Sequence, residues 1–92
     1  MKRFYIDTDE KLKEIFTEHC NLSGEQYGEI RAELIYLVAD YQEEEPKEEI
    51  EKRVNYLKAV SDFLYNTSEL TLKEHNALID LLGEIQTEGD KA

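Results

Sequence analysis

Hydrophobic residues along this chain recur at intervals of three and four, which is the spacing of one face of an α-helix. The first stripe consists of Leu12, Ile15, Phe16 and His19. Either Asp7 or Thr8 can cap this helix, and Asp7 and Glu10 stand at the spacing of a capping box, in which side chains satisfy the free backbone amides at a helix start. This pattern predicts a first helix over about residues 8–20.

A second stripe follows directly. Its members are Tyr27, Ile30, Leu34, Leu37 and Tyr41. Ser23 and Gln26 form another capping box before it, and we predict a helix over about residues 24–42. The middle of this segment, from Leu34 to Val38, is apolar nearly all round. Such a helix lies either at the centre of a bundle or under a second subunit.

Pro46 fits the first turn of a third helix, because the backbone N–H that proline lacks has no helical partner there. The predicted inner face contains Ile50, Val54, Leu57, Val60 and Leu64. Tyr56 and Phe63 widen the apolar arc to about half the circumference. We predict this helix over about residues 46–65.

Thr71 and Glu74 form a third capping box, and they begin a predicted fourth helix over about residues 72–86. The residues expected to be buried on it are Leu78, Ile79, Leu82 and Ile85. The polar tail over residues 87–92 is predicted to be frayed.

Four amphipathic segments with short connections predict an all-α fold, a small antiparallel four-helix bundle. We assign residues 1–86 to a single helical domain, in which residues 1–7 form a short arm and Phe4 to Ile6 lie extended over the bundle. The chain has 92 residues, near the lower limit for a single hydrophobic core. A deep substrate cavity is therefore not expected.

The composition is strongly acidic, with 22 acidic and 11 basic residues and a formal net charge of −11. Nucleic acids and anionic membranes would repel such a chain, so we expect neither direct nucleic-acid binding nor membrane binding. Basic protein surfaces are the expected partners. The lone Cys20, the lack of a long apolar run and the acidic N-terminal region favour a cytoplasmic location.

Two acidic features account for much of this excess. The segment from Asp40 to Glu51 contains seven acidic residues and one basic residue, Lys47, which gives a net charge of −6 within 12 residues. On the predicted second helix, a row of acids faces away from the apolar seam and Tyr36 stands among them. The residues predicted to bind a partner are Glu25, Glu29, Glu33, Tyr36, Asp40, Glu43, Glu44, Glu45, Glu48 and Glu49.

A simpler interpretation is that these acids form only a solvated surface, in part favourable to a helix start at Pro46. The helix dipole favours acidic residues only within the first turn of a helix, and like charges close together repel each other. This interpretation therefore explains the excess of acidic residues poorly. Imitation of a nucleic acid is a further hypothesis. One acidic row supplies about one charge per 6 Å, against about one per 1.7 Å of duplex, so mimicry would need the Asp40–Glu51 cluster and a dimer mate as well.

Catalytic and metal signatures are weak in this chain. His19 and His75 both project onto predicted apolar faces, where we expect hydrogen-bonded histidines at the core margin rather than a pH switch or a metal site. Zinc-type spacing, the Glu-x-x-His pattern and a Gly-rich phosphate loop are absent, and Cys20 is expected to pack against the core. We therefore expect no enzyme, no catalytic residue, no metal and no cofactor.

These observations favour a small acidic module that binds a basic protein, such as a nucleic-acid-binding one, and regulates or inhibits it. Small size and strong acidity are typical of phage and mobile-element inhibitors of host defence and of antitoxin-like regulators, a likeness of composition that no motif carries. One alternative is a structural or assembly homodimer through the second helix. Another is an immunity-type helical bundle, although such proteins often act near membranes.

Overall fold

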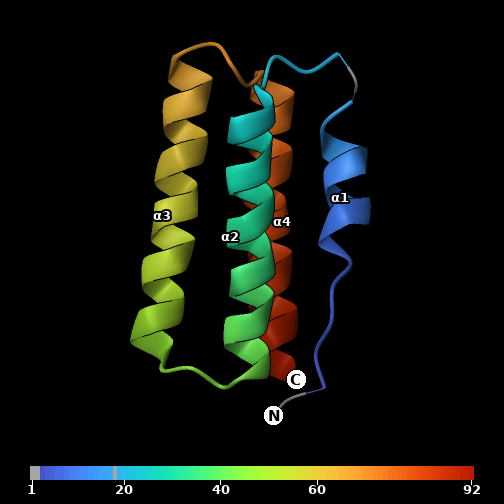
Figure 1. Cartoon of the computed structure of the whole chain (residues 1–92). Helices are drawn as coiled ribbons and strands as arrows, with labels where there is room; N and C mark the ends of the chain where they lie inside the picture. The colour runs from blue at the N-terminus through green and yellow to red at the C-terminus, as the bar shows by residue number, and fades with distance from the viewer. Residues whose placement is uncertain (1–2, 18) are drawn as a thin grey trace.

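The structure is a computed structural model that describes residues 3–17 and 19–92. The helices among these residues are α1 (Thr8–Ile15), α2 (Gly24–Gln42), α3 (Lys47–Asn66) and α4 (Leu72–Lys91). Successive helices run in opposite directions, so that α1 and α3 point one way and α2 and α4 the other (Figure 1). The described residues contain no strand. The predicted all-α antiparallel four-helix bundle is confirmed.

α2 and α4 form the centre of the bundle. They pack against each other, with α1 on one side of the pair and α3 on the other (Figure 1). Within the described part of the chain, α1 and α3 make no contact. The central position of α2 explains its apolar middle, because the chain's own helices bury Leu34, Leu37 and Val38. A second subunit is not needed to cover these residues.

The N-terminal arm extends the hydrophobic core. Phe4 is buried, and its ring lies edge-on to that of Tyr41 with the centroids 5.7 Å apart. The side-chain amide of Gln42 donates a hydrogen bond to the Phe4 carbonyl at 2.6 Å. Ile6 packs partly buried against the core, whereas Tyr5 is exposed. The expected extended cover is thus present, although residues 1–2 of the predicted arm lie outside the described residues.

Helix starts follow the predicted local signals. Ser23 Oγ accepts a hydrogen bond from the Gln26 N–H at 3.1 Å, and the Gln26 side chain accepts one from the Ser23 N–H at 2.9 Å. Thr71 begins α4 with the same capping box. At α1 the Asp7 side chain accepts a hydrogen bond from the Glu10 N–H at 3.1 Å, but the reciprocal half of the predicted box does not form among the described residues. These hydrogen bonds form between near neighbours in the chain, which is why periodicity and capping residues locate them.

The first helix is shorter than predicted, since α1 ends at Ile15 and not near residue 20. Phe16 leaves helical geometry, with φ of −108° and ψ of 107°, and is buried. Its ring lies edge-on to Tyr27 of α2, with the centroids 6.1 Å apart. His19 is consequently exposed in the connection, and its expected place on an apolar helix face is wrong. Residue 18 of the predicted helix lies outside the described residues.

The last helix is longer than predicted. α4 continues to Lys91, so the expectation of a frayed tail over residues 87–92 is wrong. Gly89 is buried, and a Cβ atom added to it would lie 2.6 Å from carbons of the Tyr41 ring. Only a residue without a side chain allows so close an approach. This contact between distant parts of the chain holds the end of α4 against α2.

Candidate functional site

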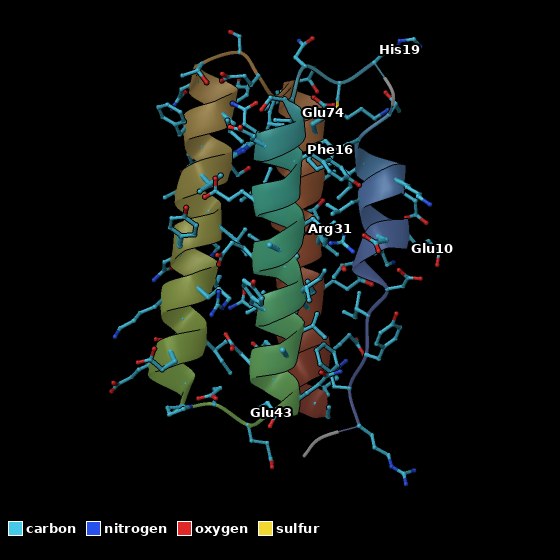
Figure 2. All side chains as sticks on the ribbon, in the orientation of Figure 1. Glu10, Phe16, His19, Arg31, Glu43 and Glu74 are labelled. Carbon is cyan, nitrogen blue, oxygen red and sulfur yellow. The ribbon has the colours of Figure 1, made fainter. Side chains whose placement is uncertain are left out.

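The residues predicted to bind a partner occupy two neighbouring regions. The turn between α2 and α3 carries the acidic corner, which we define as Glu43, Glu44, Glu45, Glu48 and Glu49. Figure 2 shows Glu43 at this end of the bundle, with His19 and Glu74 at the opposite end. The remaining predicted residues, the α2 row, are Glu25, Glu29, Glu33, Tyr36 and Asp40.

Arg53 of α3 neutralises the middle of the α2 row. Its Nη1 lies 2.7 Å from Oε2 of Glu33, and its Nε lies 2.7 Å from Oδ2 of Asp40. All three side chains are less than a third exposed. Burial alone would lower the pKa of Arg53, but its hydrogen bonds to Asp40 and Glu33 outweigh burial and raise that pKa. These two carboxylates therefore serve contacts inside the bundle.

Tyr36 also contacts Arg53. The guanidinium carbon lies 5.3 Å from the centroid of the Tyr36 ring, within the range of a cation–π interaction. The helical periodicity of the sequence did not predict this contact with α3. The ring is 51% exposed, so the side that Arg53 leaves open remains accessible to a partner.

The α2 row continues toward the start of the helix with a second contact to α3. Glu29 accepts a hydrogen bond from the hydroxyl of Tyr56. This hydrogen bond, and then the charge of the Glu29 carboxylate, raise the pKa of Tyr56. Glu25 stands in the first turn of α2, where a negative charge is favourable. The row members Glu29, Glu33, Tyr36 and Asp40 thus contact α3, and this part of the row is not a free outer face.

The acidic corner has a well-defined backbone. α2 ends in a Schellman motif, in which the N–H of Glu45 donates to the Asp40 carbonyl at 3.0 Å and the N–H of Glu44 donates to the Tyr41 carbonyl at 3.2 Å. Glu44 has a φ of 55°, in the left-handed region that glycine usually occupies at this position. Pro46 then precedes α3 directly. This turn presents the corner side chains outward.

The charge of the corner is poorly balanced. Lys52 lies 3.3 Å from Glu49 and Lys47 lies 3.9 Å from Glu51, in exposed pairs along α3 that contribute little to stability. In the described part of the chain, the corner glutamates with no cation in salt-bridge range are Glu43, Glu45 and Glu48. The negative surface expected at this turn is therefore present.

A pocket of about 290 Å³, the Tyr41 pocket, opens beside the corner where α2, α3 and the end of α4 meet. Tyr41 and Ile50 line it and are 4% and 8% exposed, so they form an apolar floor. The other lining residues are Glu44, Glu45, Lys47, Glu51, Gln86 and Asp90. Among the described lining residues, carboxylates thus outnumber ammonium groups around this pocket.

A groove of about 350 Å³ lies between α2 and α3, away from the corner. Its lining residues are Gln26, Glu29, Ala59, Val60, Phe63 and Leu64. Phe63 is 63% exposed and the nearby Tyr56 is 47% exposed, although both were expected to widen the inner face of α3. The expectation fails because α3 packs only against α2 and α4 in the described structure, and two neighbours leave the edge of a wide apolar arc uncovered.

His75 joins α4 to α3. Its Nδ1 lies 2.7 Å from Ser61 Oγ, its Nε2 lies 3.4 Å from Oδ1 of Asp62, and its ring stacks on Tyr65. These residues match a Ser–His–Asp triad in composition only, because Ser61 is 0% exposed and cannot meet a substrate. The expectation of a hydrogen-bonded histidine at the core margin is confirmed for His75.

The remaining candidate groups lie apart from one another. The His19 N–H donates to Thr17 Oγ1 at 3.3 Å, and Cys20 is partly buried against the core. Over residues 3–17 and 19–92, no three His, Cys, Asp or Glu side chains are placed to hold a metal ion. None of the helices described there combines the length and apolar character needed to cross a bilayer.

The described part of the chain is thus a four-helix bundle with an acidic corner, a partly buried arginine network and an apolar groove. No family model, no curated protein and no solved structure matches this chain.

Proposed function

We propose that this protein is a non-enzymatic binding module that regulates or inhibits a basic partner protein, and that the acidic corner makes the main contact. The observation that carries the proposal is the unbalanced charge of the corner. Glu43, Glu45 and Glu48 are exposed and have no cation in salt-bridge range within the described chain. The net charge of −11 adds long-range attraction to a basic surface.

The position of these charges supports a role in contact rather than in folding. A helix C-terminus carries partial negative charge, so acidic residues there oppose stability. The last turn of α2 contains no basic residue, and Glu43 is its C-cap. Glu48 and Glu49 stand in the first turn of α3, where the dipole favours them. The corner thus carries more like charge than its helix ends require, as functional surfaces often do.

The partner that this surface fits is a protein with clustered arginine or lysine side chains, such as the nucleic-acid groove of a nuclease or a DNA-binding protein. An inhibitor of host defence from a phage or mobile element would act in this way, and a cytoplasmic location suits its lone cysteine. Pairing of Glu33 and Asp40 with Arg53 lowers the free charge along α2. Imitation of a whole nucleic-acid duplex by one copy of this chain is therefore less favoured than binding to a basic surface.

Aromatic side chains near the acids would supply the apolar part of such an interface. Interfaces commonly place aromatic anchors inside a polar rim. Phe63 and Tyr36, both more than half exposed, lie on the same α2–α3 side of the bundle as the α2 row. We expect them to contribute to affinity after the corner has attracted the partner.

A second candidate function is that of a homodimeric assembly protein that pairs through α2. The observation in its favour is a hollow of about 280 Å³ between the arm and α2, beside the exposed side chains of Tyr5 and Ile35. Light scattering tests it. A dimer predicts a mass near twice 10.8 kDa at micromolar concentration, reduced to the monomer mass by Ile35→Asp, which changes a residue lining the hollow. A monomer at all accessible concentrations excludes this function.

Partner capture from a lysate of the native host tests the main proposal. The corner variant carries Glu43→Lys, Glu44→Lys and Glu45→Lys. The control variant carries the same reversals at three exposed acids on α1 and α4, namely Glu14, Asp80 and Glu84. Both variants have the same net charge, so a difference between them reports position.

We expect the wild type and the control variant to retain the same basic protein at low salt and to release it at high salt. The corner variant should lose that protein while its thermal stability holds or rises, because like charges have been removed from the corner. Equal capture by the corner and control variants would refute the acidic corner as the binding surface.

A further inference from the structure

The Tyr41 pocket combines features of a site for one cationic side chain. We propose that it binds an arginine side chain of the partner, with the stem against the apolar floor and the guanidinium among the surrounding carboxylates. This inference rests on the proposed function and names the chemistry that the acidic corner recognises. The pocket volume of about 290 Å³ lies near the lower limit for small-molecule sites, a size suited to a single side chain.

The hydroxyl of Tyr41 provides evidence independent of the carboxylates. The residue is 4% exposed and lines the pocket, and its hydroxyl, which makes no hydrogen bond to any residue that the structure describes, reaches solvent in the pocket. Burial first, and then the charges of Asp90 and Glu51, raise the pKa of this phenol. A neutral hydroxyl near two carboxylates can accept a hydrogen bond from a guanidinium N–H.

The floor of the pocket is held in place by the bundle. Gly89 lies so close to the Tyr41 ring that a Cβ would come within 2.6 Å of it, and Phe4 packs edge-on against the ring. The ring therefore has little freedom to move. Ile50 completes the buried surface on which the aliphatic stem of an arginine can lie. A preformed floor reduces the ordering cost of binding.

The electrostatic field at the pocket favours a cation. The C-terminal ends of α2 and α4 both lie at this end of the bundle, and each contributes partial negative charge (Figure 1). Of the described residues that line the pocket, four carry a carboxylate and one, Lys47, carries an ammonium group, with its side chain 89% exposed. The exposed Lys47–Glu51 pair is weak, so an incoming guanidinium can displace it.

The arrangement favours an extended organic cation over a metal ion. The carboxylates surround the opening, but in the described residues no three of them converge as metal ligands. A guanidinium has five donors in a plane and can reach several separate acceptors at once. The ammonium of a lysine is smaller and more strongly hydrated, so we expect it to bind less tightly.

Titration of the isotope-labelled full chain with N-acetyl-arginine amide, followed by amide NMR, tests the proposal. We expect saturable shifts at Glu45, Gln86 and Asp90, with millimolar affinity that weakens as salt is added. N-acetyl-citrulline amide, which has nearly the same shape without the charge, should give no saturable shift. N-acetyl-lysine amide should bind about two- to fivefold more weakly.

Variants locate the bound probe. Tyr41→Phe, which removes only the hydroxyl, and Asp90→Asn should each weaken the arginine derivative by about two- to fivefold. Glu14→Gln, an exposed carboxylate on α1 away from the pocket, should leave affinity unchanged. Thermal melts of each variant show that it is folded. Absence of saturable shifts at the pocket, equal shifts with citrulline, or equal affinity for lysine would overturn the proposal.

The outcomes separate this pocket from the wider function. If the arginine derivative fails to bind while the wild type still captures a basic partner in a salt-dependent way, the pocket is refuted and the proposed function stands. If the derivative binds as expected but no basic partner is captured, the proposed function is refuted and the pocket stands.

Discussion

Gly89 of α4 lies directly against the ring of Tyr41 of α2, with no room for a side chain between them. The contact connects the C-terminal turns of the bundle with the floor of the Tyr41 pocket. It also explains why α4 remains helical to Lys91. A substitution at this glycine should therefore affect both the stability of the fold and the shape of the pocket.

Gly89→Ala should lower the free energy of unfolding by about 1–3 kcal/mol, because a new methyl group would overlap the Tyr41 ring. Gly83→Ala is the matched control on the same helix. Nothing lies within 4 Å of a Cβ at Gly83, so alanine should raise stability by about 0.5–1 kcal/mol. Urea denaturation of both variants measures the difference. A stabilising effect at both glycines would contradict the close contact.

Removing the charge of Arg53 should also destabilise the bundle. Arg53→Met keeps an aliphatic stem but leaves Glu33 and Asp40 close together without a cation, at a cost of about 1–3 kcal/mol. Lys52→Met removes an exposed partner of Glu49 and should change stability by less than about 0.5 kcal/mol. Chemical denaturation at neutral pH compares them, and equal losses would count against the internal network.

Ser68 occupies a left-handed position at the end of α3, with φ of 66°. Glycine adopts this conformation without the strain that a β-carbon causes, so Ser68→Gly should stabilise the protein by about 1 kcal/mol. Asn66→Gly, within the last turn of the same helix, should instead destabilise by about 0.3 kcal/mol. Thermal unfolding reports both shifts. A loss of stability in Ser68→Gly would contradict the left-handed backbone conformation at Ser68.

Tyr41 and Tyr56 should ionise above the ordinary pKa of tyrosine when the pH is raised. Burial raises the pKa of Tyr41, and the hydrogen bond to Glu29 raises that of Tyr56. A group with a raised pKa in the folded state contributes stability below its unfolded pKa, near 10 for tyrosine, and loses it as the pH rises through the folded value. Stability should therefore fall on the alkaline side.

Phenolate absorbance of the folded protein measures this titration. Tyr41 and Tyr56 should contribute a phase above the ordinary pKa of tyrosine. Tyr56→Phe should remove part of that phase. A phase of unchanged size in Tyr56→Phe would contradict the Tyr56–Glu29 contact.

Helix type and helix starts could be predicted from the sequence because they depend on local interactions. The hydrogen bonds of Ser23 and Thr71 join residues three apart, and the apolar stripes reflect the helical repeat. The ends of α1 and α4 could not be predicted in this way. Phe16 stops α1 by packing on Tyr27, and Gly89 extends α4 by packing on Tyr41, so both ends depend on contacts with another helix.

In the candidate site, too, features that depend on neighbouring residues could be predicted, and features that depend on contacts between helices could not. The acidic excess at the corner is a property of adjacent residues, and the turn after α2 keeps it on the surface. The pairing of Glu33 and Asp40 with Arg53 depends on the register of α3 against α2. The periodicity of a single helix does not predict this register. The exposure of Phe63 likewise depends on how few helices surround α3.

The dissociation constant of the purified complex with the captured partner, measured against salt concentration, is the most direct test of the acidic corner. The wild type and the control variant should show the same affinity and the same steep loss of affinity with salt. The corner variant should bind about tenfold more weakly or worse and show a shallower salt dependence. An unchanged affinity and salt dependence in the corner variant would contradict the account.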